Sequence, residues 1–233
     1  MTPRTPVWRS TVVLKVVMAL SGLVMVGFLV AHMYGNLKVF SGQEAFDDYS
    51  HHLRELGEPL LPYGGALWII RIALLAAVGA HIFAAVTLWR RARAATGGKG
   101  SLRYVSSRSR RGSQRGYASF TMRWGGLTIA LFVIYHLMHF TWNTISPGGA
   151  SDSPYERLVN GFEIWWVVLT YTIALLAVGF HLWHGTWAAL ASLGANTSQR
   201  RRRHLNVLAT IVALVITVGF LIPPYAVLFG LVG

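Results

Sequence analysis

The stretch VVLKVVMALSGLVMVGFLVAHMYGN, residues 12–36, determines the fold class of this chain. It is apolar over more than the roughly 20 residues that a helix needs to cross a bilayer. Its one fully charged residue, Lys15, lies near its start, and His32 lies near its end. No small-residue cleavage site follows it, so we interpret it as a retained transmembrane helix and not as a signal peptide.

Four further segments have the same apolar character, near residues 64–89, 124–145, 164–191 and 205–230. Of the 233 residues, 54% are hydrophobic and only 12% are charged, whereas a soluble domain carries about 25% charged residues. The sequence therefore predicts an all-α integral membrane bundle of five transmembrane helices, in a single domain that spans residues 1–233.

Basic residues are concentrated on one side of this predicted bundle. Three segments on that side hold most of the 21 basic residues: Arg4, Arg9 and Lys15; Arg90, Arg91, Arg93, Lys99, Arg103, Arg108, Arg110, Arg111, Arg115 and Arg123; and Arg200, Arg201, Arg202 and Arg203. The positive-inside rule predicts a cytoplasmic N-terminus and an outside C-terminus, in a multi-pass protein of the cell's inner (cytoplasmic) membrane. Orientation and attraction to membrane lipid account for the net charge of +13, so we expect no nucleic-acid partner.

Short elements are predicted between the spans. Residues 41–56 show an amphipathic helical pattern, which predicts a short helix on the outer surface. Residues 61–65, Leu-Pro-Tyr-Gly-Gly, should break the chain before the second span. The Arg-, Ser- and Gly-rich segment 90–123 is predicted to be an irregular loop. We expect the fifth span to end at Pro223 and Pro224.

Four of the five spans contain a histidine: His32, His81, His136 and His181. An ionisable side chain in a membrane is costly and usually functional, and imidazole is a common ligand of haem iron. From the helical rise, His32 and His136 lie about 25 and 20 Å from the inner edge, His81 about 14 Å from it, and His181 about 27 Å from the outer edge. The depths form an outer and an inner pair, which predicts two haems and a transmembrane electron carrier.

Two neighbouring histidines leave alternatives open. His139 lies one turn from His136, and His184 lies one turn from His181. Either could be the true ligand, or could form a hydrogen bond with a haem propionate or a quinone. Arg71, inside the second span, could equally extend toward the membrane surface or neutralise a propionate. His51, His52 and His204 are interpreted as solvent-facing.

The chain has no cysteine. This excludes a covalently attached c-type haem and an iron–sulfur cluster held by its own thiolates. A glycine-rich dinucleotide fingerprint is also missing, since Gly97–Gly100 lies in a basic segment and not between a strand and a helix. The chain must therefore receive electrons from a partner, and its basic inner face is the expected docking surface.

Motifs around the four histidines occur in a fixed order along residues 9–205. They are Phe28–Asn36 with Gly42–Phe46, then Val78–His81, then Arg123–Gly126 with His136 ten residues on, and then Phe180–Trp187 with Leu193–Gly194. As an ordered set they resemble the cytochrome b membrane-anchor subunit of succinate dehydrogenase and fumarate reductase, in the single-polypeptide, five-helix, di-haem class. Within this resemblance, the motifs favour His136 over His139 and His181 over His184.

The resemblance implies a set of cofactors and partners. Two haem b groups would be held, the outer iron by His32 and His136 and the inner iron by His81 and His181. A flavoprotein that oxidises succinate and an iron–sulfur protein would dock on the cytoplasmic face, and membrane quinone, often menaquinone in this class, would be the substrate. Such a subunit serves electron transport between the tricarboxylic acid cycle and the respiratory chain, while succinate oxidation takes place on a partner subunit.

Other functions remain as alternatives. A cytochrome b subunit of a hydrogenase, formate dehydrogenase or nitrate reductase would also use membrane histidines, and its copurifying subunits would identify it. A transporter with proton-relaying histidines would show inverted repeats and broken helices, and the sequence has neither signal. We further hypothesise that quinone reacts near the outer haem, with His139, Glu163 and the acidic outer-loop residues as candidate proton groups.

Overall fold

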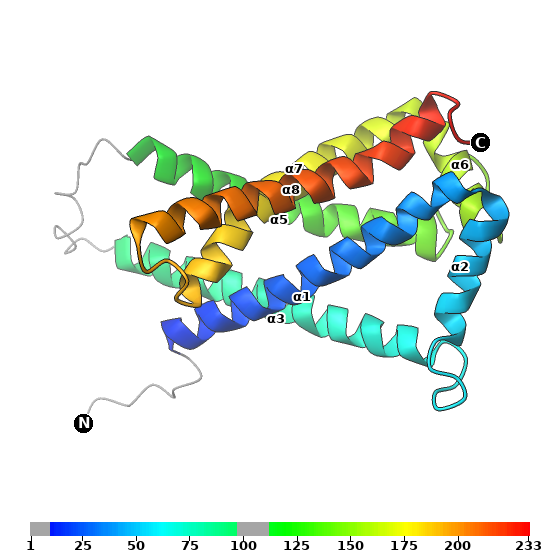
Figure 1. Cartoon of the computed structure of the whole chain (residues 1–233). Helices are drawn as coiled ribbons and strands as arrows, with labels where there is room; N and C mark the ends of the chain where they lie inside the picture. The colour runs from blue at the N-terminus through cyan, green and yellow to red at the C-terminus, as the bar shows by residue number, and fades with distance from the viewer. Residues whose placement is uncertain (1–9, 97–111) are drawn as a thin grey trace.

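The computed structural model describes residues 10–96 and 112–233, and all regular structure in these residues is helical (Figure 1). The α-helices are α1 (Thr11–Leu37), α2 (Gln43–Glu55), α3 (Gly65–Thr96), α5 (Gly112–His136), α6 (Pro154–Phe162), α7 (Trp165–Ser192) and α8 (Gln199–Leu228). A short 3₁₀ turn, η2 (Lys38–Ser41), extends α1, and a π turn, η3 (Leu137–Thr141), extends α5.

Five of these helices are long and apolar enough to cross a membrane, which confirms the predicted fold class. The candidate spans are Thr11–Ser41, Gly65–Ala94, Met122–Thr141, Trp165–Ser192 and Gln199–Leu228. Serine side chains mark the starts of the first and last of these helices. Ser10 Oγ accepts a hydrogen bond from the amide of Val13, and Ser198 Oγ accepts one from the amide of Arg201, so each satisfies an amide that the helix leaves unpaired.

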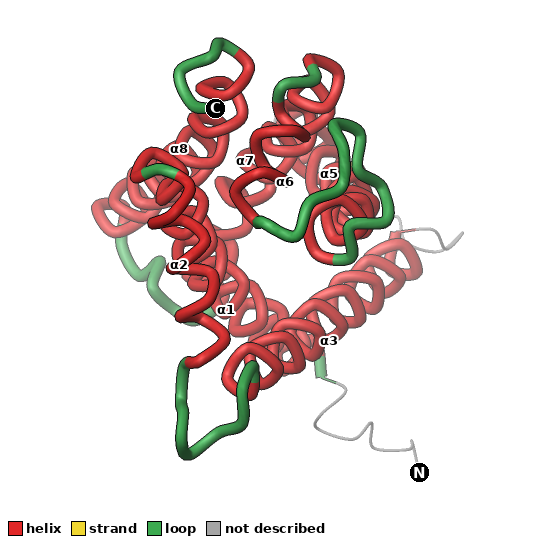
Figure 2. Tube along the Cα trace, turned by 90° about the vertical axis from the view of Figure 1, so that its right-hand side faces the viewer, coloured by secondary structure: helices red, strands yellow, loops and turns green. Residues whose placement is uncertain are grey.

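Helix α7 lies at the centre of the bundle. It packs against α1, α5 and α8, and its residues Val167 and Val168 are almost fully buried. Helix α3 lies at the edge, where its main contact is with α1 (Figure 2). Most large apolar side chains on the outside of the long helices are exposed, as expected for surfaces that face lipid tails.

One end of the bundle is covered by α2 and α6, and we call it the outer end because the charge pattern predicts that it faces outside (Figure 1). The predicted amphipathic helix is present as α2, and its Phe46 is buried against Tyr155 of α6. The carboxylate of Asp47 accepts hydrogen bonds from Ser153 Oγ at 2.6 Å and from the amide of Tyr155 at 3.0 Å. These bonds fasten α2 to the first turn of α6.

Two expectations need correction, and one short helix was not expected. The segment 90–123 is not wholly irregular, because α3 continues to Thr96 and α5 begins at Gly112, and only residues 97–111 lie outside the described part. Arginine and alanine are good helix formers and make up residues 90–95, so α3 extends beyond its apolar part. Helix α6 was not predicted. Pro223 and Pro224 do not end α8 but lie inside it. Proline lacks a backbone N–H, but in a membrane bundle neighbouring helices and side chains can satisfy the carbonyls that this leaves unpaired.

Candidate functional site

The outer pair consists of His32 on α1 and His136 on α5. Their ring centroids lie 5.7 Å apart, and the ring planes are almost perpendicular at 83°. Aromatic side chains surround them, with the ring of Phe28 at 5.3 Å and that of Phe220 at 5.5 Å from His32, and that of Phe132 at 5.8 Å from His136. Two histidines that are 104 positions apart in the sequence are thus brought together in an apolar environment.

The inner pair consists of His81 on α3 and His181 on α7, whose ring centroids lie 6.2 Å apart. The Nδ1 atom of His81 lies 3.1 Å from the backbone oxygen of Met18 and 3.2 Å from Ser21 Oγ, both on α1. Because a carbonyl oxygen can only accept, His81 carries its proton on Nδ1 and its lone pair on Nε2. This tautomer is typical of metal-binding histidines.

Small residues make room for the rings of the inner pair. A Cβ at position 22 would lie 3.5 Å from Cε1 of His81, and a Cβ at position 126 would lie 3.7 Å from Cε1 of His181. The Nδ1 atom of His181 is buried and has no hydrogen-bond partner among the residues that the structure describes. The inner pair therefore has one histidine fixed by hydrogen bonds and one that is positioned by packing.

The spacing of both pairs suits two axial ligands on one metal. Two imidazoles that bind a metal from opposite sides at ~2.0 Å place their ring centres roughly 6 Å apart. Within the described residues, no group of three or more histidine, cysteine or acidic side chains is placed to hold a metal ion. A pair of histidines is what a haem needs from the protein, because the macrocycle supplies the other ligands. Iron binding at these positions stays a prediction.

The neighbouring histidines have other contacts. His139 is buried, and its Nδ1 lies 3.0 Å from the hydroxyl of Tyr171. A Cβ at position 161 would lie only 2.7 Å from its Nε2, so its ring fills the space above Gly161. The ring of His184 lies 4.7 Å from that of its neighbour Trp183, tilted by 37°. Neither ring pairs with another histidine within the described part of the chain, which favours His136 and His181 as members of the pairs.

Tyr171 lies next to the outer pair and was not among the site residues predicted from the sequence. Its hydroxyl lies 3.4 Å from Nδ1 of His136 as well as 3.0 Å from Nδ1 of His139. A tyrosine in the middle of an apolar span is a weak sequence signal, because its buried hydroxyl must find a partner. The sequence does not show which partner it finds.

Arg71 is exposed on α3, and its guanidinium carbon lies 5.1 Å from the ring centre of Trp68, one turn away. This contact joins the arginine to an aromatic side chain of its own helix. Snorkelling and pairing with a propionate both remain predictions for it. His51, His52 and His204 are exposed, as expected.

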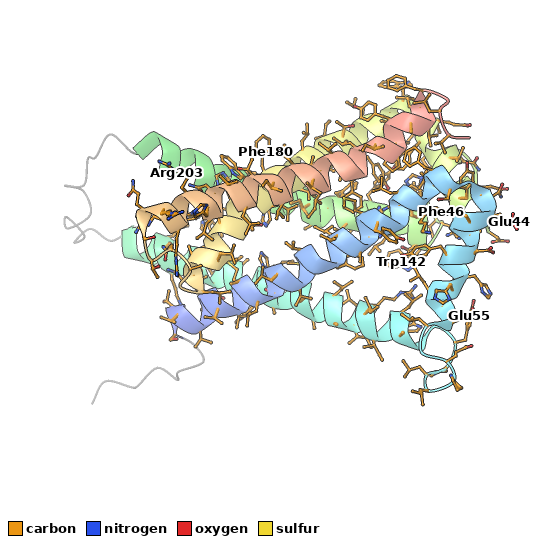
Figure 3. The ribbon with its side chains drawn as sticks, in the orientation of Figure 1. Glu44, Phe46, Glu55, Trp142, Phe180 and Arg203 are labelled. Atoms are coloured by element: carbon orange, nitrogen blue, oxygen red, sulfur yellow. The ribbon has the colours of Figure 1, made fainter. Side chains whose placement is uncertain are left out.

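The helix ends opposite α2 and α6 hold most of the basic residues that the structure describes, and we call this end the basic end (Figure 3). Arg203 is labelled there, whereas Glu44 and Glu55 lie at the outer end. The guanidinium carbons of Arg93 and Arg123 lie 5.2 and 5.8 Å from the ring centre of Trp89. Lys99, Arg103, Arg108, Arg110 and Arg111 of the predicted docking segment, and Arg4 and Arg9, lie outside the described residues.

A family model described as succinate dehydrogenase/fumarate reductase transmembrane subunit matches residues 103–218, about half of the chain. The matched region contains the whole of α5, α6 and α7 and the first part of α8, and with them His136 and His181. No curated protein and no solved structure gives a significant match.

Proposed function

We propose, from the premise that this chain belongs to the succinate dehydrogenase/fumarate reductase transmembrane subunit family, that it is the di-haem cytochrome b anchor of a succinate:quinone oxidoreductase. It would carry electrons between an iron–sulfur partner and membrane quinone. The observation that carries the proposal is the presence of two histidine pairs at two levels of the bundle, with ring centroids 5.7 and 6.2 Å apart.

Each pair would hold one haem b. His32 and His136 would bind the outer iron, and His81 and His181 the inner iron. Haem iron supplies one-electron oxidation and reduction when it is bound. The protein's part is to present each imidazole in the right tautomer, and the hydrogen bond from His81 Nδ1 to the Met18 carbonyl does this for the inner pair.

The electron donor must be another protein, because the chain lacks cysteine. The family anchors a complex of this kind in the membrane, which implies a flavoprotein and an iron–sulfur subunit. We propose that both dock at the basic end, in the cytoplasm, where the arginines attract an acidic surface. Anionic lipid would compete for part of the same charge.

Quinone, which we propose to be menaquinone, would react near the outer pair. If quinone reacted at the cytoplasmic edge, one haem at the inner pair would be enough to reach it. A second haem at the outer pair would be useful if the quinone reacts on the outer side. A membrane potential that is negative inside drives electrons outward and protons inward, at ~2.3 kcal/mol per charge per 100 mV. Quinone reduction at the outer side, with protons taken from outside, would therefore be assisted by the potential. Near this side, His139, Glu163 and the outer-loop acids are the candidate proton groups.

Purification in mild detergent tests the proposal. We expect a reduced-minus-oxidised spectrum of low-spin haem b, two haems per chain, and copurification of a flavoprotein and an iron–sulfur protein with succinate dehydrogenase activity. Copurification with hydrogenase, formate dehydrogenase or nitrate reductase subunits would support the alternative cytochrome instead. Intact complex without haem absorbance would contradict the electron-carrying role.

A further inference from the structure

The Tyr171 hydroxyl lies between two imidazoles, one of which belongs to the outer pair. Nδ1 of His136 is 3.4 Å away and Nδ1 of His139 is 3.0 Å away. Tyr171 itself is buried, with 4% of its surface exposed, and His139 with 2%. Water has little access to these groups, so their hydrogen bonds must be satisfied by one another.

The direction of the hydrogen bonds follows from counting donors. If His136 binds iron through Nε2, its proton is on Nδ1, and this N–H donates to the Tyr171 oxygen. The Tyr171 hydroxyl then has one proton of its own, which needs an acceptor. Nδ1 of His139 is the acceptor within reach, so His139 carries its proton on Nε2. The result is a directed chain from His136 through Tyr171 to His139.

Packing holds the three residues of this hydrogen-bond series in place. The ring of Tyr171 meets Phe132 at 4.9 Å and Phe162 at 5.0 Å, both edge-on. The ring of His139 stacks on Phe140 at 4.0 Å, and Gly161 leaves space for its Nε2 edge, where a Cβ would lie 2.7 Å away. Helices α5, α6 and α7 together thus fix the Tyr171 hydroxyl relative to His136.

We propose that Tyr171 is a positioning residue that fixes the Nδ1 proton of His136 and lowers the redox potential of the outer centre. His139 is the last acceptor in this series of hydrogen bonds. This inference rests on the proposed function. Donation from Nδ1–H to an oxygen makes an imidazole a more basic ligand, which stabilises ferric over ferrous iron. Tyr171 therefore holds the outer potential below the value that the histidine ligands would give without it.

Replacement of Tyr171 by Phe tests the inference, because it removes the hydroxyl and keeps the ring. In a redox titration of the purified complex, we expect the outer haem of Tyr171→Phe to be several-fold more reduced at a fixed ambient potential. A tenfold change, the upper end of this expectation, corresponds to a shift of ~59 mV for one electron. The inner haem should titrate as in the wild type, because neither His81 nor His181 has a hydrogen bond or ring contact with Tyr171 in the described part of the chain.

Tyr135→Phe is the matched control. Tyr135 is one turn from His139 on the same face, but its hydroxyl is buried without a hydrogen-bond partner among the described residues. Its loss should leave both potentials unchanged. His139→Phe should shift the outer potential in the same direction as Tyr171→Phe, but by less. In this variant the Tyr171 oxygen still accepts the hydrogen bond from His136, and it loses only the polarisation that its own hydrogen bond to His139 provides.

Two results would overturn the inference. One is an unchanged outer potential in Tyr171→Phe. The other is loss of the outer haem in Tyr171→Phe while Tyr135→Phe keeps it, since the hydroxyl would then be needed for assembly and not for tuning. A His136→Ala variant in the same series separates this failure from failure of the proposed function. If His136→Ala retains both haems, the ligand assignment itself is wrong.

Discussion

Nδ1 of His81 on α3 donates a hydrogen bond to the backbone oxygen of Met18 on α1, at 3.1 Å. The Ser21 hydroxyl, 3.2 Å from the same nitrogen, gives its own proton to the Val17 carbonyl at 2.7 Å and so offers His81 a second acceptor. Helix α1 therefore orients a histidine that belongs to its neighbour. The lone pair of His81 is then on Nε2, and the centroid of the His181 ring lies 6.2 Å from that of His81.

Replacement of one paired histidine should remove one haem. We expect His81→Ala or His181→Ala to lose the inner haem, and His32→Ala or His136→Ala to lose the outer one, because an iron with one axial ligand is bound weakly. Difference spectra and haem content per chain measure the effect. His184→Ala is the control and should keep both haems. Retention of both haems in all four variants would make His139 and His184 the next candidates.

Enlargement of Gly22 should affect the inner site alone. A leucine at this position would extend past the Cβ, which already lies 3.5 Å from His81 Cε1, and would displace the imidazole from its place in the inner pair. We expect Gly22→Leu to lose the inner haem absorbance and to retain the outer one. Gly79→Leu is the control, because a Cβ at position 79 meets nothing within 4 Å. Equal loss in both variants would point to disturbed insertion instead.

Asp47 should stabilise the outer end of the fold. Its carboxylate accepts two hydrogen bonds at the start of α6, where a negative charge also interacts well with the helix dipole. Asp47→Ala should destabilise the protein by about 2 kcal/mol, a typical cost for hydrogen bonds to a charged group. Thermal unfolding in detergent measures it. Asp48→Ala, at the exposed neighbouring position, should change the midpoint little, and similar effects of both would contradict the role of the α2–α6 link.

The basic segment between α3 and α5 should contribute to docking of the soluble partners. Reversal of Arg103, Arg108 and Arg110 to Glu is expected to weaken copurification of the flavoprotein and iron–sulfur subunits, since it repels an acidic partner surface. The haem spectrum serves as the control and should not change. Undiminished copurification would leave lipid attraction and membrane orientation as the sole roles of these charges.

The side of quinone reaction can be tested in sealed vesicles. If quinone reacts near the outer pair, succinate–quinone activity should respond to the membrane potential and change when an uncoupler collapses it. Leaky vesicles provide the control, because the uncoupler has no gradient to act on there. Activity that is indifferent to the potential in sealed vesicles would place the quinone at the cytoplasmic side.

Much of the fold could be predicted because long apolar segments are a strong signal. The helices that contain the predicted spans 64–89 and 164–191 are Gly65–Thr96 and Trp165–Ser192. The short helix α6 was missed, although Ser153, Pro154 and Glu156 form a recognisable start signal. The parts of helices that extend beyond the membrane were also missed, because their polar residues give no hydropathy signal.

The candidate site was predictable in part. The positions of His32, His81, His136 and His181 gave their depths, since depth depends only on the helical rise. Which face each histidine occupies depends on how the helices rotate and pack, and this is a tertiary property. For the same reason the contacts of Tyr171 with two histidines could not be predicted.

The paired prolines of α8 have a consequence for the dynamics of the outer site. Pro223 and Pro224 have no amide hydrogens, so the carbonyls of Gly219 and Phe220 receive no hydrogen bond from the turn that follows. Phe220 forms part of the wall around His32, at 5.5 Å, and Gly219 lies against Met33. Local opening of the outer site should therefore occur at α8. Backbone amides of α8 near Phe220 should exchange with solvent faster than those of α7.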